Sequence, residues 1–213
     1  MSGRGFYRQY SGMFRVSTGA CVVVAITFLA GIASGAVGVK ALAADQKSEL
    51  LAYVDAFMRG IVRYTEPVSR GKVLHASLLN NARTAAATWF LGVTVIGIPV
   101  TILILFTRGF VLGFTVGFLV EELGYKGVAF SAAAILPHNL LAVPALLCLG
   151  IASLSFSFGL IASKRAGIGV DFLGEFWRYT VIALILTLVL LISSGIEGLV
   201  TPAVLGVIAP RMV

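Results

Sequence analysis

The residues best suited to chemistry form a short polar group inside an apolar run, ILPHNLLAVPA at 135–145. Pro137 has no backbone N–H, so within a helix it leaves the carbonyl of Ala133 without its usual donor. His138 and Asn139 can satisfy such a freed carbonyl or bond a neighbouring helix. Alternatively, they line a polar vestibule or pore, because polar groups within a bilayer usually face a protein interior or a wet cavity. The sequence leaves both interpretations open.

The motifs that mark common catalytic and metal sites are missing from the sequence. It contains no HExxH, CxxC or GxSxG pattern and no P-loop. Its two histidines, His75 and His138, lie far apart, and its two cysteines, Cys21 and Cys148, sit in apolar runs. We therefore predict that the protein is not an enzyme and has no catalytic residue, metal site or cofactor.

Composition points to a membrane protein. Hydrophobic residues make up 59% of the 213 residues and charged residues 12%, and the mean hydropathy is +1.01. A soluble domain typically has about 25% charged residues. The net charge of +7 comes from basic residues scattered between apolar runs, which indicates charges flanking membrane spans and no nucleic-acid partner. We expect an all-α, polytopic helix bundle in the lipid bilayer, with residues 1–213 forming one membrane domain.

The apolar runs predict about five transmembrane helices, because about 20 apolar residues cross the hydrocarbon of a bilayer. The 36 apolar residues of the fourth run would make a straight helix of about 54 Å, which is too long for one crossing. Pro137 and Pro144 predict that this span is kinked or broken near 137–144, and Pro99 is a further kink position. The predicted spans are 18–40, 85–106, 109–123, 128–163 and 179–195.

Basic residues predict the orientation of these spans. The first 17 residues contain Arg4, Arg8 and Arg15 and no acidic residue, which places the N-terminus in the cytoplasm. Five crossings then place the C-terminus outside. The first loop, 41–84, would also lie outside, although it carries more basic residues than the positive-inside rule favours.

Within the 41–84 loop, one segment has the pattern of an amphipathic helix. Leu50, Val54, Phe57 and Ile61 recur at helical spacing and predict such a helix over 46–63. The helix either lies on the membrane or binds another protein, or it simply packs on the spans of its own chain.

Three glycines in the third predicted span follow a small-xxx-small pattern. Gly109, Gly113 and Gly117 lie four residues apart, which lets another helix backbone approach closely. The partner helix belongs either to the same chain or to a second copy in a homo-oligomer.

Several longer motifs resemble one protein family. They are WFLGVTVIGIPV at 89–100, RGFVLGFTVGFLV at 108–120, GYKG at 124–127 and ILPHNLL at 135–141. Together they resemble the stage II sporulation protein M family over about 85–160, with His138 where the family pattern has glutamine. The resemblance implies a non-catalytic membrane scaffold of the sporulation engulfment machinery. Such a scaffold works in peptidoglycan remodelling with sporulation proteins D and P, two cell-wall hydrolases, in the mother-cell membrane at the septum.

These observations yield two functional hypotheses. The first is a multi-pass scaffold whose outer surface binds the hydrolases through Leu50, Val54, Phe57, Ile61, Glu121 and Glu122. The alternative is a small permease or channel with a polar site at His138 and Asn139, which predicts solute flux that changes on His138→Ala.

Overall fold

The protein is a bundle of helices in the computed structural model, which confirms the predicted fold class. The structure describes residues 17–63, 70–94, 96–166 and 171–208, and for 57–63, 70, 72, 73, 166 and 199–208 it describes the backbone alone. Within this part of the chain every regular element is helical. Basic residues 4, 8 and 15, on which the orientation rests, lie outside the described residues.

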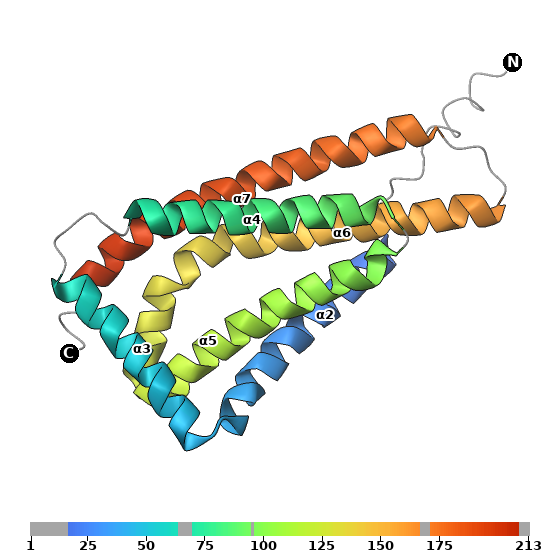
Figure 1. Cartoon of the computed structure of the whole chain (residues 1–213). Coiled ribbons are helices and arrows are strands. Elements are labelled where there is room, and N and C mark those ends of the chain that lie inside the picture. Colours follow the sequence, from blue (N-terminus) through green and yellow to red (C-terminus); the bar gives the residue numbers. More distant parts are fainter. Residues whose placement is uncertain (1–16, 64–69, 95, 167–170, 209–213) are drawn as a thin grey trace, which may run out of the picture.

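The helices form two groups that lie close together where α4 is followed by α5 and diverge towards the other end (Figure 1). In the first group, α2 (Thr18–Gly38) packs along α5 (Gly97–Ala134). In the second group, α4 (Arg70–Gly92), α6 (Leu136–Ala166) and α7 (Phe172–Ile208) lie side by side. After the short 3-10 turn Val39–Ala41, helix α3 (Ala44–Arg63) extends from the first group towards the second, and we call this end of the molecule the α3 end.

Four segments of the described chain are long and apolar enough to cross a membrane, where the sequence predicts five. They are Thr18–Ala41, Gly97–Ala134, Leu136–Arg165 and Phe172–Gly198. Helix α4 is not among them, although it also runs from the α3 end to the opposite end (Figure 1). Helix α2 begins at the opposite end and α7 finishes at the α3 end (Figure 1). Placing the two termini on opposite sides of the membrane requires an odd number of crossings, so the predicted placement requires that α4 also crosses the bilayer.

The structure divides the second and third predicted spans differently. Predicted span 85–106 is interrupted, because α4 ends at Gly92 and α5 begins at Gly97. The hydroxyl of Thr94 accepts a hydrogen bond from the backbone N–H of Gly97 at 3.2 Å. Pro99 then falls in the first turn of α5, where a missing N–H removes no helical hydrogen bond. It therefore marks the start of a helix and not a kink within one.

Helix α5 runs through position 108 without interruption and turns at Gly124 instead. Gly124 has φ 57° and ψ −132°, a conformation that residues with side chains rarely adopt. Beyond this turn the chain folds back, so that Phe130 packs with Leu119 in one buried cluster. The predicted boundary between spans at 107–108 is thus absent, and α5 consists of two legs on either side of Gly124.

The predicted break in the fourth span lies slightly earlier than expected. Ile135 separates α5 from α6, and Pro137 occupies the first turn of α6, where it is tolerated. Pro144 lies inside α6, which bends along its length (Figure 1). Helix α7 extends well beyond predicted span 179–195 at both ends, and the side chain of Asp171 accepts a hydrogen bond from the N–H of Gly174 just before it.

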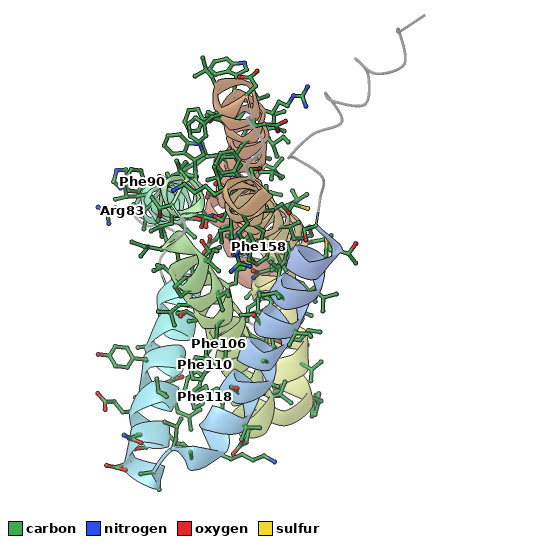
Figure 2. All side chains as sticks on the ribbon, turned by 90° about the vertical axis from the view of Figure 1, so that its right-hand side faces the viewer. Arg83, Phe90, Phe106, Phe110, Phe118 and Phe158 are labelled. Atoms are coloured by element: carbon green, nitrogen blue, oxygen red, sulfur yellow. The ribbon has the colours of Figure 1, made fainter. Side chains whose placement is uncertain are left out.

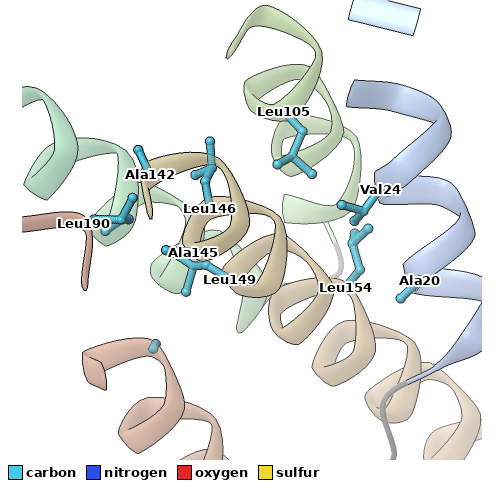
Figure 3. Close-up of a cluster of buried hydrophobic side chains, with 11 residues drawn as sticks. Ala20, Val24, Leu105, Ala142, Ala145, Leu146, Leu149, Leu154 and Leu190 are labelled. Atoms are coloured by element: carbon cyan, nitrogen blue, oxygen red, sulfur yellow. The ribbon is translucent and has the colours of Figure 1, made fainter. Parts of the chain in front are cut away.

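Apolar packing between the two groups forms the main core (Figure 3). Val24, Leu105, Leu149 and Leu154 are almost completely buried there. Outside the core, large apolar side chains point away from the protein, among them Leu29, Leu188 and Ile192 at about 60% exposure. An exposed apolar surface of this kind suits a bundle surrounded by lipid.

Aromatic side chains reinforce one face of α5. Phe106, Phe110, Phe114 and Phe118 stack along the helix, with neighbouring ring centroids 6.0–6.5 Å apart. Figure 2 shows three of the labelled rings in line along α5, next to α2. This row lies beside the glycine stripe of the same helix.

Candidate functional site

A partly open cavity of about 680 Å³ lies where α4, α5, α6 and α7 meet. Its volume falls within the range of about 300–1,000 Å³ that is usual for ligand pockets. Apolar residues such as Leu103, Val111 and Val143 form much of the wall. The polar lining consists of Asn80, Asn81, Thr84, Thr107, Arg108, Thr115, His138, Asn139 and Glu197.

Arg108 is the cationic group of the cavity. It lies near the middle of the first leg of α5, in a segment that qualifies as a membrane span. Its guanidinium donates to the hydroxyl of Thr84. With the Asn80 amide turned so that its oxygen faces Arg108, the guanidinium also donates to this oxygen at 3.2 Å. Both partners are neutral, and Arg108 forms no ion pair with a carboxylate of the described residues.

Glu197 is the anionic group, and it belongs to a second polar cluster. The hydroxyl of Ser77 on α4 donates to one of its carboxylate oxygens. The same oxygen lies 3.4 Å from Nδ1 of His138. The hydroxyl of Ser193 is 3.0 Å from that Nδ1 and donates to the backbone carbonyl of His138 at 2.8 Å. His138 therefore connects α6 to α7 as well as lining the cavity.

Asn139 occupies the helix break and the cavity wall together. Its side-chain N–H₂ donates to the carbonyl of Ile135 at 2.8 Å. This carbonyl lies at the junction of α5 and α6, two residues after Ala133, where the sequence pointed. The backbone N–H of Asn139 bonds the same carbonyl at 3.2 Å, so this carbonyl is not one that Pro137 leaves free. Asn139 also lines the cavity.

A separate group of hydroxyls ties α4 to α6 and α7 near the opposite end. Tyr179, which is fully buried, donates to the carbonyl of Trp89 at 2.9 Å. Ser153 donates to the carbonyl of Thr88 at 3.1 Å, and Ser157 donates to that of Gly92 at 2.7 Å. The carbonyls of Trp89 and Gly92 are among the last four of α4, which have no partner within the helix, and that of Thr88 lies one residue earlier.

Some of the predicted outer residues already have partners in their own chain, since Glu121 and Glu122 are paired with Lys47. Lys47 on α3 is 2.5 Å from Glu121 and 3.4 Å from Glu122 at the end of the first leg of α5. The hydrogen bond to Glu121 raises the pKa of Lys47 above its usual 10.5. Leu50 and Val54 are half-buried, and Val54 packs against the cluster of Leu119 and Phe130. The side chains of Phe57 and Ile61 lie outside the described residues.

The three predicted packing glycines of α5 lie against α2 of the same chain. A Cβ atom at Gly113 would stand 2.1 Å from the carbonyl oxygen of Ile32, and one at Gly109 would stand 2.4 Å from that of Phe28. At Gly117 the nearest atom would be the Cα of Ala36, at 3.1 Å. The stripe thus serves packing within the chain, and it is not free to bind a second copy.

Sequence reasoning missed two of the charged residues that define the cavity. It placed Arg108 between two spans and Glu197 after the last one, because each stands next to the end of an apolar run. The sequence does contain a pattern that could have predicted a polar face on α4. Polar residues recur there at helical spacing, at Ser77, Asn81, Thr84 and Thr88. Among the described residues, no three His, Cys, Asp or Glu side chains are grouped so as to hold a metal ion.

The fold and the cavity define a helical membrane protein with a polar interior. The family model for stage II sporulation protein M matches residues 24–202, and the chain belongs to this family. The resemblance seen in the sequence is therefore confirmed, and it extends well beyond 85–160. Searches of curated proteins and of solved structures found no match.

Proposed function

We propose that the protein is a non-catalytic scaffold of the engulfment machinery, which holds sporulation proteins D and P at the septal membrane of the mother cell. The observation that carries the proposal is the attachment of α3 to the tip of α5. Lys47 and Val54 fix one side of α3 there and leave its other side exposed. Membership of the sporulation protein M family supports the same role.

The residues proposed to contact the hydrolases are Glu49 and Tyr53 on α3 and Tyr125 beside the Gly124 turn, all of which are exposed. Tyr53 is 70% exposed on the outer side of α3, and Tyr125 is 82% exposed next to the Gly124 turn. Tyrosine combines a large apolar ring with a hydroxyl and is enriched where proteins bind one another. These residues replace Leu50, Val54, Glu121 and Glu122 as the proposed contacts, because those four are turned towards their own chain or paired with it.

The orientation predicted from the sequence agrees with this choice of face. If the N-terminus is cytoplasmic, α2 crosses outward and the α3 end faces the cell wall. The proposed contact residues then lie on the side where peptidoglycan hydrolases act.

Co-purification tests the proposal. The full chain is expressed with the D and P proteins of the same organism, extracted in mild detergent and recovered on a tag. Wild-type protein should retain at least one hydrolase, and Tyr53→Ala combined with Tyr125→Ala should weaken binding by about thirtyfold, the effect of losing one hot spot of about 2 kcal/mol. Trp177→Ala is the matched control, because Trp177 is 66% exposed on α7 towards the opposite end.

Two results would contradict the scaffold. One is no recovery of either hydrolase in several detergents and after crosslinking in native membranes. The other is equal loss in the Trp177→Ala control, which would indicate that exposed aromatic residues anchor the protein at the membrane interface.

The cavity favours a second candidate function, a small permease or channel. His138 and Asn139 line it together with Arg108 and Glu197, so the polar site is larger than the sequence alone indicated. Reconstituted vesicles that show solute or ion flux changing on His138→Ala would support this function. Vesicles as tight as protein-free controls would exclude it for the solutes tested.

A further inference from the structure

The charge of Arg108 is the feature of the cavity that the scaffold function does not explain. An arginine within a span is costly and usually pairs with other groups or faces a water-filled cavity. Arg108 is oriented from the α4 side by Thr84 and Asn80, which are both neutral. A guanidinium has more N–H donors than these two partners accept, and Arg108 also lines the cavity.

The second charge in the cavity is engaged elsewhere. Glu197 accepts from Ser77 and lies within ion-pair distance of His138. Its charge also acts on Arg108, but the two side chains do not approach closely enough to form an ion pair. The cavity therefore presents a cationic group that favours an anionic ligand.

The remaining walls suit a molecule with an apolar part. Leu103 and Val111 line the cavity one turn on either side of Thr107 and are 61% and 55% exposed. They continue the polar pocket into an apolar strip along α5. In a span, this strip faces the hydrocarbon of the bilayer.

We propose that the cavity binds a membrane lipid that carries a phosphate headgroup. The phosphate accepts hydrogen bonds from Arg108, and Asn139 and Thr107 lie within the same lining to contact the rest of the headgroup. The acyl chain follows Leu103 and Val111 into the bilayer. Arginine suits this role because its planar donors match phosphate oxygens in pairs. The inference does not depend on the binding of hydrolases.

Native mass spectrometry of the purified full chain tests the proposal. The protein is titrated in detergent with phosphatidylglycerol, with diacylglycerol of the same chains, and separately with inorganic phosphate. We expect phosphatidylglycerol to be retained and diacylglycerol, which lacks the phosphate, to be lost. We also expect Arg108→Gln to weaken phosphatidylglycerol binding by about tenfold or more, the size of one lost charged hydrogen bond.

Two further variants separate the site from general charge effects. Arg83→Gln removes the same charge from the outward face of α4, away from the cavity lining, and should bind as wild type (Figure 2). Arg108→Lys keeps the charge without the planar donors and should recover part of the binding, which also shows that loss in Arg108→Gln does not come from misfolding.

Three outcomes would overturn the proposal. Equal loss in Arg83→Gln would indicate non-specific attraction to cationic protein. Undiminished binding in Arg108→Gln would show that the headgroup lies elsewhere. If inorganic phosphate competed with the lipid at equal concentration, the cavity would be a site for a free anion and not for a lipid.

Discussion

The molecule holds its helices together in two different ways. Between α2 and α5, glycines let the backbones touch, and a Cβ at Gly113 would stand 2.1 Å from a carbonyl oxygen. Between α4, α6 and α7, hydroxyls of Ser153, Ser157 and Tyr179 bond the carbonyls at the end of α4. In lipid the hydrophobic effect does little to bring helices together, so close packing and hydrogen bonds provide the stability.

The difference determines how each interface responds to mutation. The glycine interface consists of backbone contacts that cannot move aside, so a larger side chain must separate the helices. The hydroxyl interface consists of several separate bonds, each worth about 0.6 kcal/mol on average within membranes. We therefore expect the first interface to fail abruptly and the second to weaken gradually.

The largest effect is expected for Gly113→Leu. The new side chain meets the backbone of Ile32, and overpacking of this kind costs about 3 kcal/mol or more. The level of protein in the membrane and its thermal unfolding in detergent should both fall. Gly195→Leu is the matched control, because a Cβ at Gly195 meets nothing within 4 Å. Normal abundance and stability of the Gly113→Leu protein would refute the close α2–α5 contact.

A moderate effect is expected for Tyr179→Phe. Loss of the buried hydroxyl leaves the carbonyl of Trp89 without this donor and should cost about 0.6–1.7 kcal/mol. Thermal unfolding in detergent should shift by a few degrees, and Ser157→Ala should shift it less. Tyr125→Phe removes an exposed hydroxyl and should change nothing. Equal stability of Tyr179→Phe and Tyr125→Phe would mean that the hydroxyl interface contributes no stability.

The smallest effect concerns the attachment of α3, which uses neither mode of packing. Because the hydrogen bond to Glu121 raises the pKa of Lys47 above 10.5, the ion pair contributes below pH 10.5 and is lost as the pH rises through the raised value. A spin label at Ala52→Cys, with both native cysteines replaced, should become more mobile above that pH. Lys47→Gln should show the mobile spectrum already at neutral pH.

The control for this experiment is Lys164→Gln, which changes an exposed lysine at the opposite end of the bundle. Unchanged label mobility in Lys47→Gln would show that Val54 and its apolar neighbours hold α3 without the ion pair.

Sequence reasoning worked best where a feature depends on neighbours along the chain. The membrane class followed from composition, and the small-residue stripe of α5 followed from glycines four residues apart. It was less accurate at Arg108, which it treated as the flank of a span. A charged residue next to an apolar run is interpreted as the end of a span unless its hydrogen-bond partners are known. The partners of Arg108, Thr84 and Asn80, lie on a different helix.

The amphipathic helix 46–63 shows the same limit. Its periodicity predicts a helix with one apolar side, and α3 covers this segment. Whether that side binds another protein or its own chain depends on the turn at Gly124, which brings Phe130 back to Leu119 beneath Val54. No spacing within 46–63 contains this information.

The sequence by itself determined the family, the helical membrane class and the break near Pro137, because hydropathy, glycine spacing and proline act locally. It did not locate the boundary between α4 and α5 or the turn at Gly124. The tertiary structure decided which faces meet, since it alone brings residues from four helices around one cavity. The physical reason is the cost of a polar group in lipid: Arg108, His138 and Glu197 are tolerable only where other helices supply their hydrogen-bond partners. Those partners are distant in sequence and adjacent in the fold.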